Sequence, residues 1–146
     1  MSTQASPRQL LERYRIESLI NTILDCYQIP DTTQQLTLNL RHSGFYTQRT
    51  GIQPVEIRLE RTTVQSQWSI RFIATFDYPN QSAKSVDVAL YFNFQFQWFY
   101  QPDIKRCDLN QPEAIALLKS WLEAFVNQLT GQHFDQQHLT IAAQFS

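Results

Sequence analysis

The sequence has little charge of either sign. Its 146 residues include 12 Lys plus Arg and 13 Asp plus Glu, which gives a net charge of −1, and charged residues make up 17% of the chain. Nucleic-acid-binding domains usually carry a basic excess, and proteins that mimic nucleic acid carry an acidic one. The balance argues against both classes and against a nucleic acid as partner. Glutamine, with 19 residues, supplies much of the missing polarity.

Cysteine, glycine and long apolar runs are scarce as well. Cys26 and Cys107 are too few and too far apart in the sequence for a disulfide framework or a metal knuckle. Three glycines cannot build a glycine-rich phosphate loop. The N-terminal segment reaches Glu12 without the apolar run of a signal peptide or a membrane-spanning helix. We therefore expect a cytoplasmic protein with no cofactor, no metal and no membrane partner.

The chain has the length and the apolar content of one domain. Apolar residues make up 42% and aromatic residues 13% of the sequence, enough to fill a core without disulfides or metal. The sequence predicts a single domain over residues 1–146, with residues 1–5 disordered.

Two segments show the spacing of amphipathic helices. Ser6 and Pro7 open the first, in which apolar residues recur at three- and four-residue steps until a stop before Pro30. Asn110, followed three residues later by Glu113, resembles a capping box and opens the second, which ends at Gly131. Each segment therefore predicts one continuous helix.

The remaining segments alternate apolar and polar residues, which indicates half-buried strands. These segments are 36–41, 55–60, 67–77, 86–100 and 139–145. In 67–77 the even positions from Trp68 to Phe76 are assigned to the apolar face. The run 86–100 exceeds the length of a normal strand, so we expect a bend or bulge near Asn93 to Gln97, or two strands. The fold class predicted is α+β: a twisted antiparallel sheet of about five to seven strands, with an N-terminal and a C-terminal helix on one face.

The segment Gly51 to Glu60, with its Gly-x-x-Pro-Val-Glu-Ile-Arg-Leu pattern, resembles an uncharacterised bacterial family of domains of unknown function. Trp68, the pair Asp77–Tyr78, the aromatic strand and the helix containing Trp121 belong to the same resemblance. That family is in turn similar in fold to the mitochondrial acidic matrix protein, also known as a complement receptor. This likeness implies a protein-binding or scaffolding role, a homo-oligomer in the form of a ring-shaped trimer, and no enzymatic activity. It carries over no site residues, and the net charge of −1 departs from the acidity of the mitochondrial protein.

The aromatic strand suggests a first interaction surface. Its even positions, from Phe92 to Tyr100, could stack on nucleic-acid bases, but few cations lie near them, and their assignment to the core is favoured. The opposite face would carry amides in place of charges, and amides desolvate at lower cost than charges. The predicted subunit or partner interface consists of Tyr91, Asn93, Gln95, Gln97 and Phe99.

A polar loop supplies the second candidate binding site. It contains Arg41, His42, Phe45, Tyr46 and Arg49, which include residue types enriched at binding hot spots. The alternative is a surface loop whose aromatic side chains fold back on the edge of the sheet.

No catalytic or metal-binding motif stands out. Glu56 and Glu60 share a strand face with an arginine between them, which favours solvated ion pairs over general acid and base roles. His133 and His138 lack a zinc-binding spacing. No residue is therefore assigned as catalytic or as a metal ligand.

Taken together, these features predict a non-enzymatic protein-interaction or scaffolding domain that forms a homo-oligomer. The alternative is a small-molecule-binding domain or an enzyme, with a pocket between a helix and the curved sheet that is lined by Trp68, Phe94 and Trp98.

Overall fold

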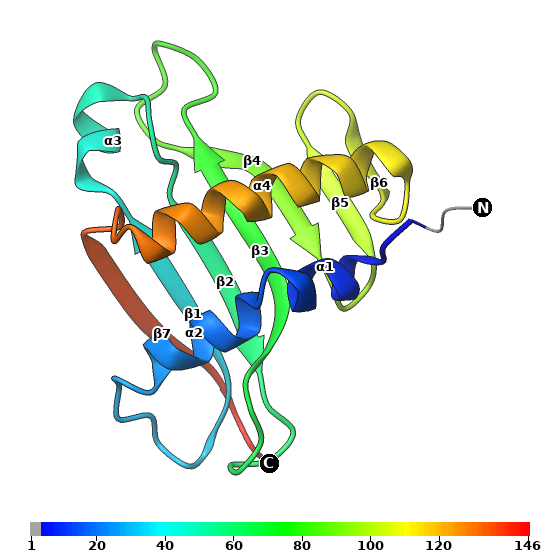
Figure 1. The fold of residues 1–146 in the computed structure, drawn as a ribbon. Helices are drawn as coiled ribbons and strands as arrows, with labels where there is room; N and C mark the ends of the chain where they lie inside the picture. Colours follow the sequence, from blue (N-terminus) through cyan, green and yellow to red (C-terminus); the bar gives the residue numbers. More distant parts are fainter. Residues whose placement is uncertain (1–3) are drawn as a thin grey trace.

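One open sheet of antiparallel strands organises the chain. The computed structural model describes residues 4–146, and in this range the sheet has seven strands in the order β6-β5-β4-β3-β2-β1-β7 (Figure 1). The strands are β1 (Thr33–Arg41), β2 (Val55–Glu60), β3 (Ser69–Asp77), β4 (Asp87–Asn93), β5 (Trp98–Gln101), β6 (Lys105–Asp108) and β7 (Gln136–Gln144). The last strand of the chain thus pairs with the first, at the edge opposite β6.

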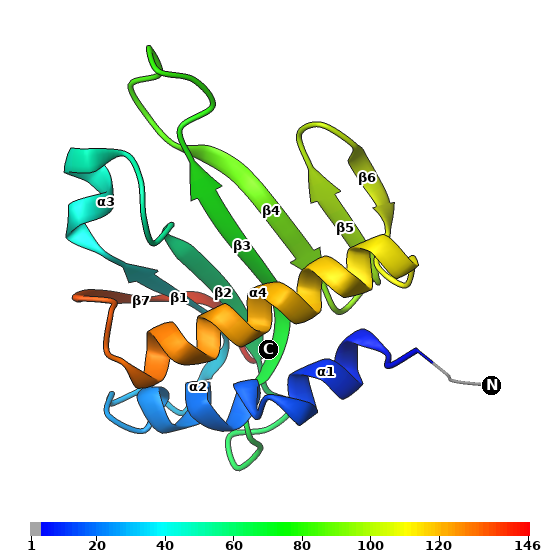
Figure 2. The ribbon, with the colours of Figure 1, turned by 45° about the horizontal axis from the view of Figure 1, so that its top comes forward.

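The helices that contribute most to the core lie on one face of this sheet. They are α1 (Pro7–Arg13), α2 (Ile16–Leu24) and α4 (Pro112–Thr130), and both views of the ribbon place them on the same side (Figures 1 and 2). A short helix, α3 (Ser43–Gln48), lies in the segment that was expected to be only a loop. The predicted α+β class, with helices from both ends of the chain over one face of an antiparallel sheet, is confirmed.

Aliphatic side chains of the central strands form the base of the core. Leu36, Leu38 and Leu40 of β1 lie opposite Leu59, Ile57 and Val55 of β2, and all six are fully or almost fully buried. The core also takes in the N-terminal residue Ala5, which is half-buried against it. Residues 1–3 of the segment predicted to be disordered lie outside the described residues.

The N-terminal helical segment is broken, where one continuous helix was expected. Arg15 adopts a left-handed conformation with φ of 56°, which separates α1 from α2. Leu11 and Ile16 are five residues apart, a spacing that a continuous helix would not bring onto one face. The break turns the second helix so that both residues are buried in the same core.

The long aromatic segment forms two strands, one of the outcomes that its length predicts. The turn Phe94 to Gln97, in which Gln97 has a φ of 62°, separates β4 from β5. Because β4 ends at Asn93, opposite Phe72, the first residues of β3 extend past their neighbour strand.

The two predicted helix caps have different outcomes. Ser6 forms the expected cap: its hydroxyl accepts from the amide of Gln9, and the Gln9 side chain accepts from the amide of Ser6. The capping box at Asn110 is wrong, because the residue before α4 is Gln111, which makes no side-chain cap. The Asn110 amide group donates instead to Asp108 and to Gln97.

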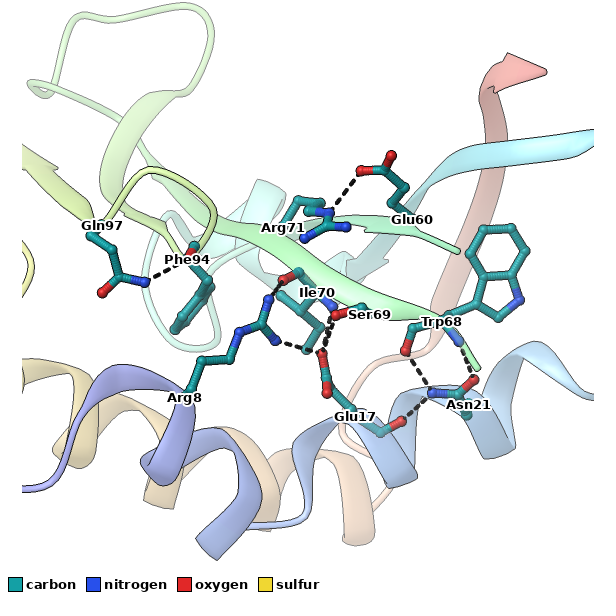
Figure 3. Close-up of polar contacts among 10 residues, drawn as sticks. All are labelled: Arg8, Glu17, Asn21, Glu60, Trp68, Ser69, Ile70, Arg71, Phe94 and Gln97. Carbon is teal, nitrogen blue, oxygen red and sulfur yellow. Dashed lines mark hydrogen bonds and ion pairs between the residues drawn. The ribbon is translucent and has the colours of Figure 1, made fainter. Parts of the chain in front are cut away.

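Side chains of α1 and α2 bind the overhanging start of β3, as Figure 3 shows. The carboxylate of Glu17 accepts from the backbone amide of Ile70 at 2.6 Å and from Arg8 at 2.9 Å. Arg8 also donates to the carbonyl of Ile70, at 2.8 Å. The amide group of Asn21 pairs with both the N–H and the carbonyl of Trp68. These helix side chains thus supply the hydrogen bonds that a neighbouring strand would have made, and they fix the helices to the sheet.

Replacing Glu17 by Ala leaves the amide of Ile70 without its acceptor. We expect a loss of about 1–2 kcal/mol in the free energy of unfolding, measured by urea denaturation. Glu12→Ala is the matched control: Glu12 is exposed on α1, and the expected change stays within about 0.5 kcal/mol. Equal losses for the two variants would show that the contact with β3 contributes nothing specific.

Candidate protein-interaction surface

The face of the sheet opposite the three main helices carries a row of stacked side chains. Phe72, Tyr91 and Trp98, from β3, β4 and β5, stack with ring centroids 4.9 and 4.7 Å apart. At one end the guanidinium of Arg58 lies 5.5 Å from the centroid of Phe72, and at the other end that of Arg106 lies 4.4 Å from the centroid of Trp98. We call these five residues the aromatic row; it spans the five strands β2 to β6.

In the aromatic row the three rings and Arg58 are half-buried and Arg106 is exposed. Each aromatic pair contributes about 0.5–1.5 kcal/mol beyond its buried area, and each arginine contact about 0.5–1 kcal/mol. Burial raises the pKa of the Tyr91 hydroxyl above its ordinary value of 10.0, so this hydroxyl is neutral at physiological pH. It accepts a hydrogen bond from Asn93 at 3.4 Å. The row is therefore a rigid surface whose charge is confined to its two arginine ends.

The stacking also decides which ligands the row can hold. Each ring turns its faces toward its neighbours in the row, at interplanar angles of 29° and 18°. Nucleic-acid bases stack on free ring faces, and the arginines cover the outer faces of Phe72 and Trp98. The row therefore presents ring edges and guanidinium groups, which suit a protein surface better than a nucleobase.

A shallow groove of about 340 Å³ lies beside the end of the row at Trp98. Two tyrosines, an arginine and apolar atoms dominate its lining, which consists of Asp87, Val88, Tyr91, Trp98, Tyr100 and Arg106. The groove has room for an apolar side chain of a partner.

The interface predicted from the aromatic strand is only partly on this face. Tyr91 belongs to it and is half-buried, and Asn93 belongs to it but is only 7% exposed. Phe99 is 1% exposed and stacks on Phe92 in the core, so its assignment to the exposed face is wrong. Gln95 and Gln97 lie in the turn between β4 and β5. The physical reason is the turn itself, which reverses the alternation and brings Trp98 and Tyr100 onto the open face in place of Phe99.

The residues of the second candidate site are mostly engaged within the protein. Phe45, on α3, is 1% exposed and stacks on Tyr78 with the centroids 5.7 Å apart. The guanidinium of Arg49 lies 3.7 Å from the centroid of the same Tyr78 ring and donates to the carbonyl of Ala83 at 2.6 Å. Tyr46 and Arg41 remain exposed. The side chain of Phe45 thus packs against Tyr78, directly after β3, so the alternative for this loop applies to one of its two aromatic side chains.

The start of α3 is tied to the segment between α4 and β7. The carboxylate of Asp135 accepts from the backbone amide and the hydroxyl of Ser43, at 2.9 and 2.5 Å. The ring Nδ1 of His42 bonds to the backbone carbonyl of His133 at 3.0 Å. His42 and Asp135 therefore position α3.

The pocket expected between helix and sheet does not form from the predicted residues. Trp68 and Phe94 are buried in the core, whereas Trp98 lies on the opposite face. A pocket of about 510 Å³ lies elsewhere, between the loop after β3 and the β5–β6 turn, where Asp77, Asp87, Asp103 and Tyr100 contribute to its lining.

Two carboxylates on the sheet form local contacts. Glu60 pairs with Arg71 at 2.7 Å, and Asp77 accepts from Gln53 at 3.1 Å. Cys26 and Cys107 are both free thiols. Among residues 4–146, no group of three or more His, Cys, Asp and Glu side chains is arranged to hold a metal ion. In the same range, no helix is both long and apolar enough to span a bilayer.

The bonds from Ser43 lower the pKa of the Asp135 carboxyl below its ordinary value of 3.8. Because the pKa of Asp135 is lower in the folded state, this contact stabilises the fold fully at a pH above the ordinary pKa of the carboxyl. The stabilisation is lost as the pH falls through the pKa of the folded state. Carboxyl-carbon NMR titration should show Asp135 titrating below 3.8 and moving back toward it in Ser43→Ala. An unchanged titration in that variant would contradict the contact.

The model of a family described as a protein of unknown function, DUF2787, matches residues 14–140. No curated protein matches the sequence.

Two solved structures from Vibrio cholerae share the fold. A hypothetical protein from the VSP-II pathogenicity island is 20% identical with a TM-score of 0.78, and the match covers 97% of this chain and 99% of that one. A conserved hypothetical protein from the pathogenicity island VPI-2 is 22% identical with a TM-score of 0.66, and the match covers 94% of each chain. The second is described as sharing structural homology with the human P32 protein, the complement-receptor protein to which the sequence resemblance pointed. Because the family model matches well over half of this chain, the chain belongs to the DUF2787 family of proteins of unknown function.

Proposed function

We propose that this protein is a non-enzymatic interaction domain of the cytoplasm that binds a protein partner through the aromatic row. The observation that carries the proposal is the row itself: stacked aromatic rings, with an arginine at each end, on a sheet face that α1, α2 and α4 do not cover. The two free thiols support a reducing compartment.

The chemistry of the row supports binding in two ways. Trp, Tyr and Arg are the residue types that most often dominate the free energy of protein association. Their side chains are already ordered by one another, and ordering a free side chain on binding costs about 0.5–1.5 kcal/mol. A partner that places an apolar side chain in the groove beside Trp98 would bury the ring edges without this cost.

The fold supports the class of function. The solved structure that shares homology with P32 has the same architecture as this chain. Proteins of the P32 kind assemble as ring-shaped trimers and bind protein ligands, which favours a scaffolding role and self-association for this chain.

Trp98→Ala removes the largest ring of the row and should cost about 2 kcal/mol or more in partner binding, about a 30-fold loss. The measurement is co-purification of the tagged protein from its native cells, with quantitative mass spectrometry of the bound proteins. Urea denaturation of the same variant checks that it folds.

Two matched variants complete the test. Ile104→Ser changes an exposed apolar side chain in the β5–β6 turn, outside the aromatic row, and it should retain the partner. Tyr46→Ala tests the α3 surface separately. Retention of every partner by Trp98→Ala, or loss in Tyr46→Ala alone, would refute binding through the aromatic row.

Small-molecule binding is a second candidate, favoured by the pocket of about 510 Å³. This volume falls within the range of about 300–1,000 Å³ that is usual for ligand sites. Three carboxylates at its border, those of Asp77, Asp87 and Asp103, would favour a cationic ligand. Screening with small organic amines by protein-observed NMR tests the idea; shifts at Tyr100 would support it, and their absence would remove it.

A further inference from the structure

The two edges of the sheet differ in how they are protected. The edge strand β6 has four residues and carries Lys105, Arg106 and Asp108, so its charges discourage pairing with another chain. The other edge strand, β7, has nine residues and no Asp, Glu, Lys or Arg. Within residues 4–146 its only strand partner is β1, so one whole edge of β7 keeps its backbone N–H and carbonyl groups unpaired. Figure 1 shows β7 at the border of the sheet, with no strand beyond it.

The helix-side surface next to this edge is apolar and uncovered. Ile141 is 48% exposed although it belongs to the apolar face of the sheet, where it lies opposite the buried Leu36. A groove of about 350 Å³ runs along it, and its lining includes Tyr27, Ile29, Leu139 and Ile141. The unpaired edge and the groove form one continuous surface, because β7 contributes to both.

We propose that β7 pairs with β7 of a second copy of this chain, antiparallel and across a two-fold axis. A register that pairs all nine residues is centred on Thr140. It places Gln136 against Gln144 of the second copy and Thr140 against its own counterpart. It also places Leu139 against Ile141 of the second copy on the helix side, where the exposed part of both side chains is buried. The two sheets join into one, and the free backbone groups of both edges are satisfied.

The absence of charged side chains in β7 favours a second copy of the chain as its partner. A two-fold axis brings identical residues close together, so a strand that pairs with itself must avoid like charges near its centre. β7 meets this condition, because the only titratable side chain in it is His138, which would face Ala142 of the second copy. Self-pairing uses each β7 edge once and therefore produces a dimer, not the trimer that the likeness to P32 suggests. The pairing of β7 does not involve the aromatic row.

Light scattering at about 100 µM should give twice the chain mass of 17.2 kDa. In a background of Cys26→Ser and Cys107→Ser, Thr140→Cys should form a disulfide-linked dimer with a mild oxidant. Cα atoms opposite each other in antiparallel strands lie about 4.5–5.5 Å apart, within the range of a disulfide. Gln136→Cys in the same background is the matched control and should stay uncrosslinked, because its counterpart in this register is Gln144.

Thr140→Lys provides a test without covalent chemistry. Thr140 is exposed, so the fold should tolerate lysine, but two lysines would oppose each other on the axis and shift the mass toward 17.2 kDa. Thr50→Lys, at another exposed threonine, should remain a dimer. A wild-type mass of one or three chains, equal crosslinking of the two cysteine variants, or a dimer that persists in Thr140→Lys would each overturn the proposal. Trp98→Ala should keep the dimer mass, so this proposal and the proposed function fail separately.

Discussion

Burial of one face of the sheet is the constraint on which the other features depend. The aliphatic side chains of β1, β2 and β3 need a cover, and α1, α2 and α4 supply it from a single side. The bonds from Arg8, Glu17 and Asn21 to the start of β3 fix that cover in place. Since all three helices are used on this side, the opposite face must be stable in contact with water. Stacking in the aromatic row reduces the apolar area that this face exposes to water, because neighbouring rings cover part of each other.

The sequence predicts the helices and strands well where one period persists over many residues. The alternation in β1 and β2 is unbroken, and the structure pairs Leu38 with Ile57 as that alternation requires. The predicted assignment of residues to the two faces of the sheet is wrong where a bulge or turn shifts the alternation by one residue. The register of β3 shifts next to Arg71, so Ile73 becomes a core residue and Phe72 moves to the open face. Ile73, an apolar residue among polar odd positions, is the signal in the sequence that could have revealed this shift.

The aromatic row depends on the same shifts, at the bulge in β3 and at the turn between β4 and β5. For this reason Tyr91 is the one residue of the row that the sequence predicts as an interface residue. Arg58 and Arg106 join the row through contacts between strands that are distant in the sequence. Local patterns could not show that Phe99 and Trp98 exchange faces after the turn at Gln97. By contrast, the absence of charge in β7 is visible in the sequence, but its meaning appears only once β7 is known to be an edge strand.

The central claim is that the open face of the sheet is where a protein partner binds. Hydroxyl-radical footprinting of the complex isolated from native cells tests it most directly, since aromatic side chains react readily when they are accessible to solvent. Phe72, Tyr91 and Trp98 should be labelled in the isolated protein and protected in the complex. Protection confined to exposed residues of α1, α2 and α4, with unchanged labelling of Trp98, would contradict it.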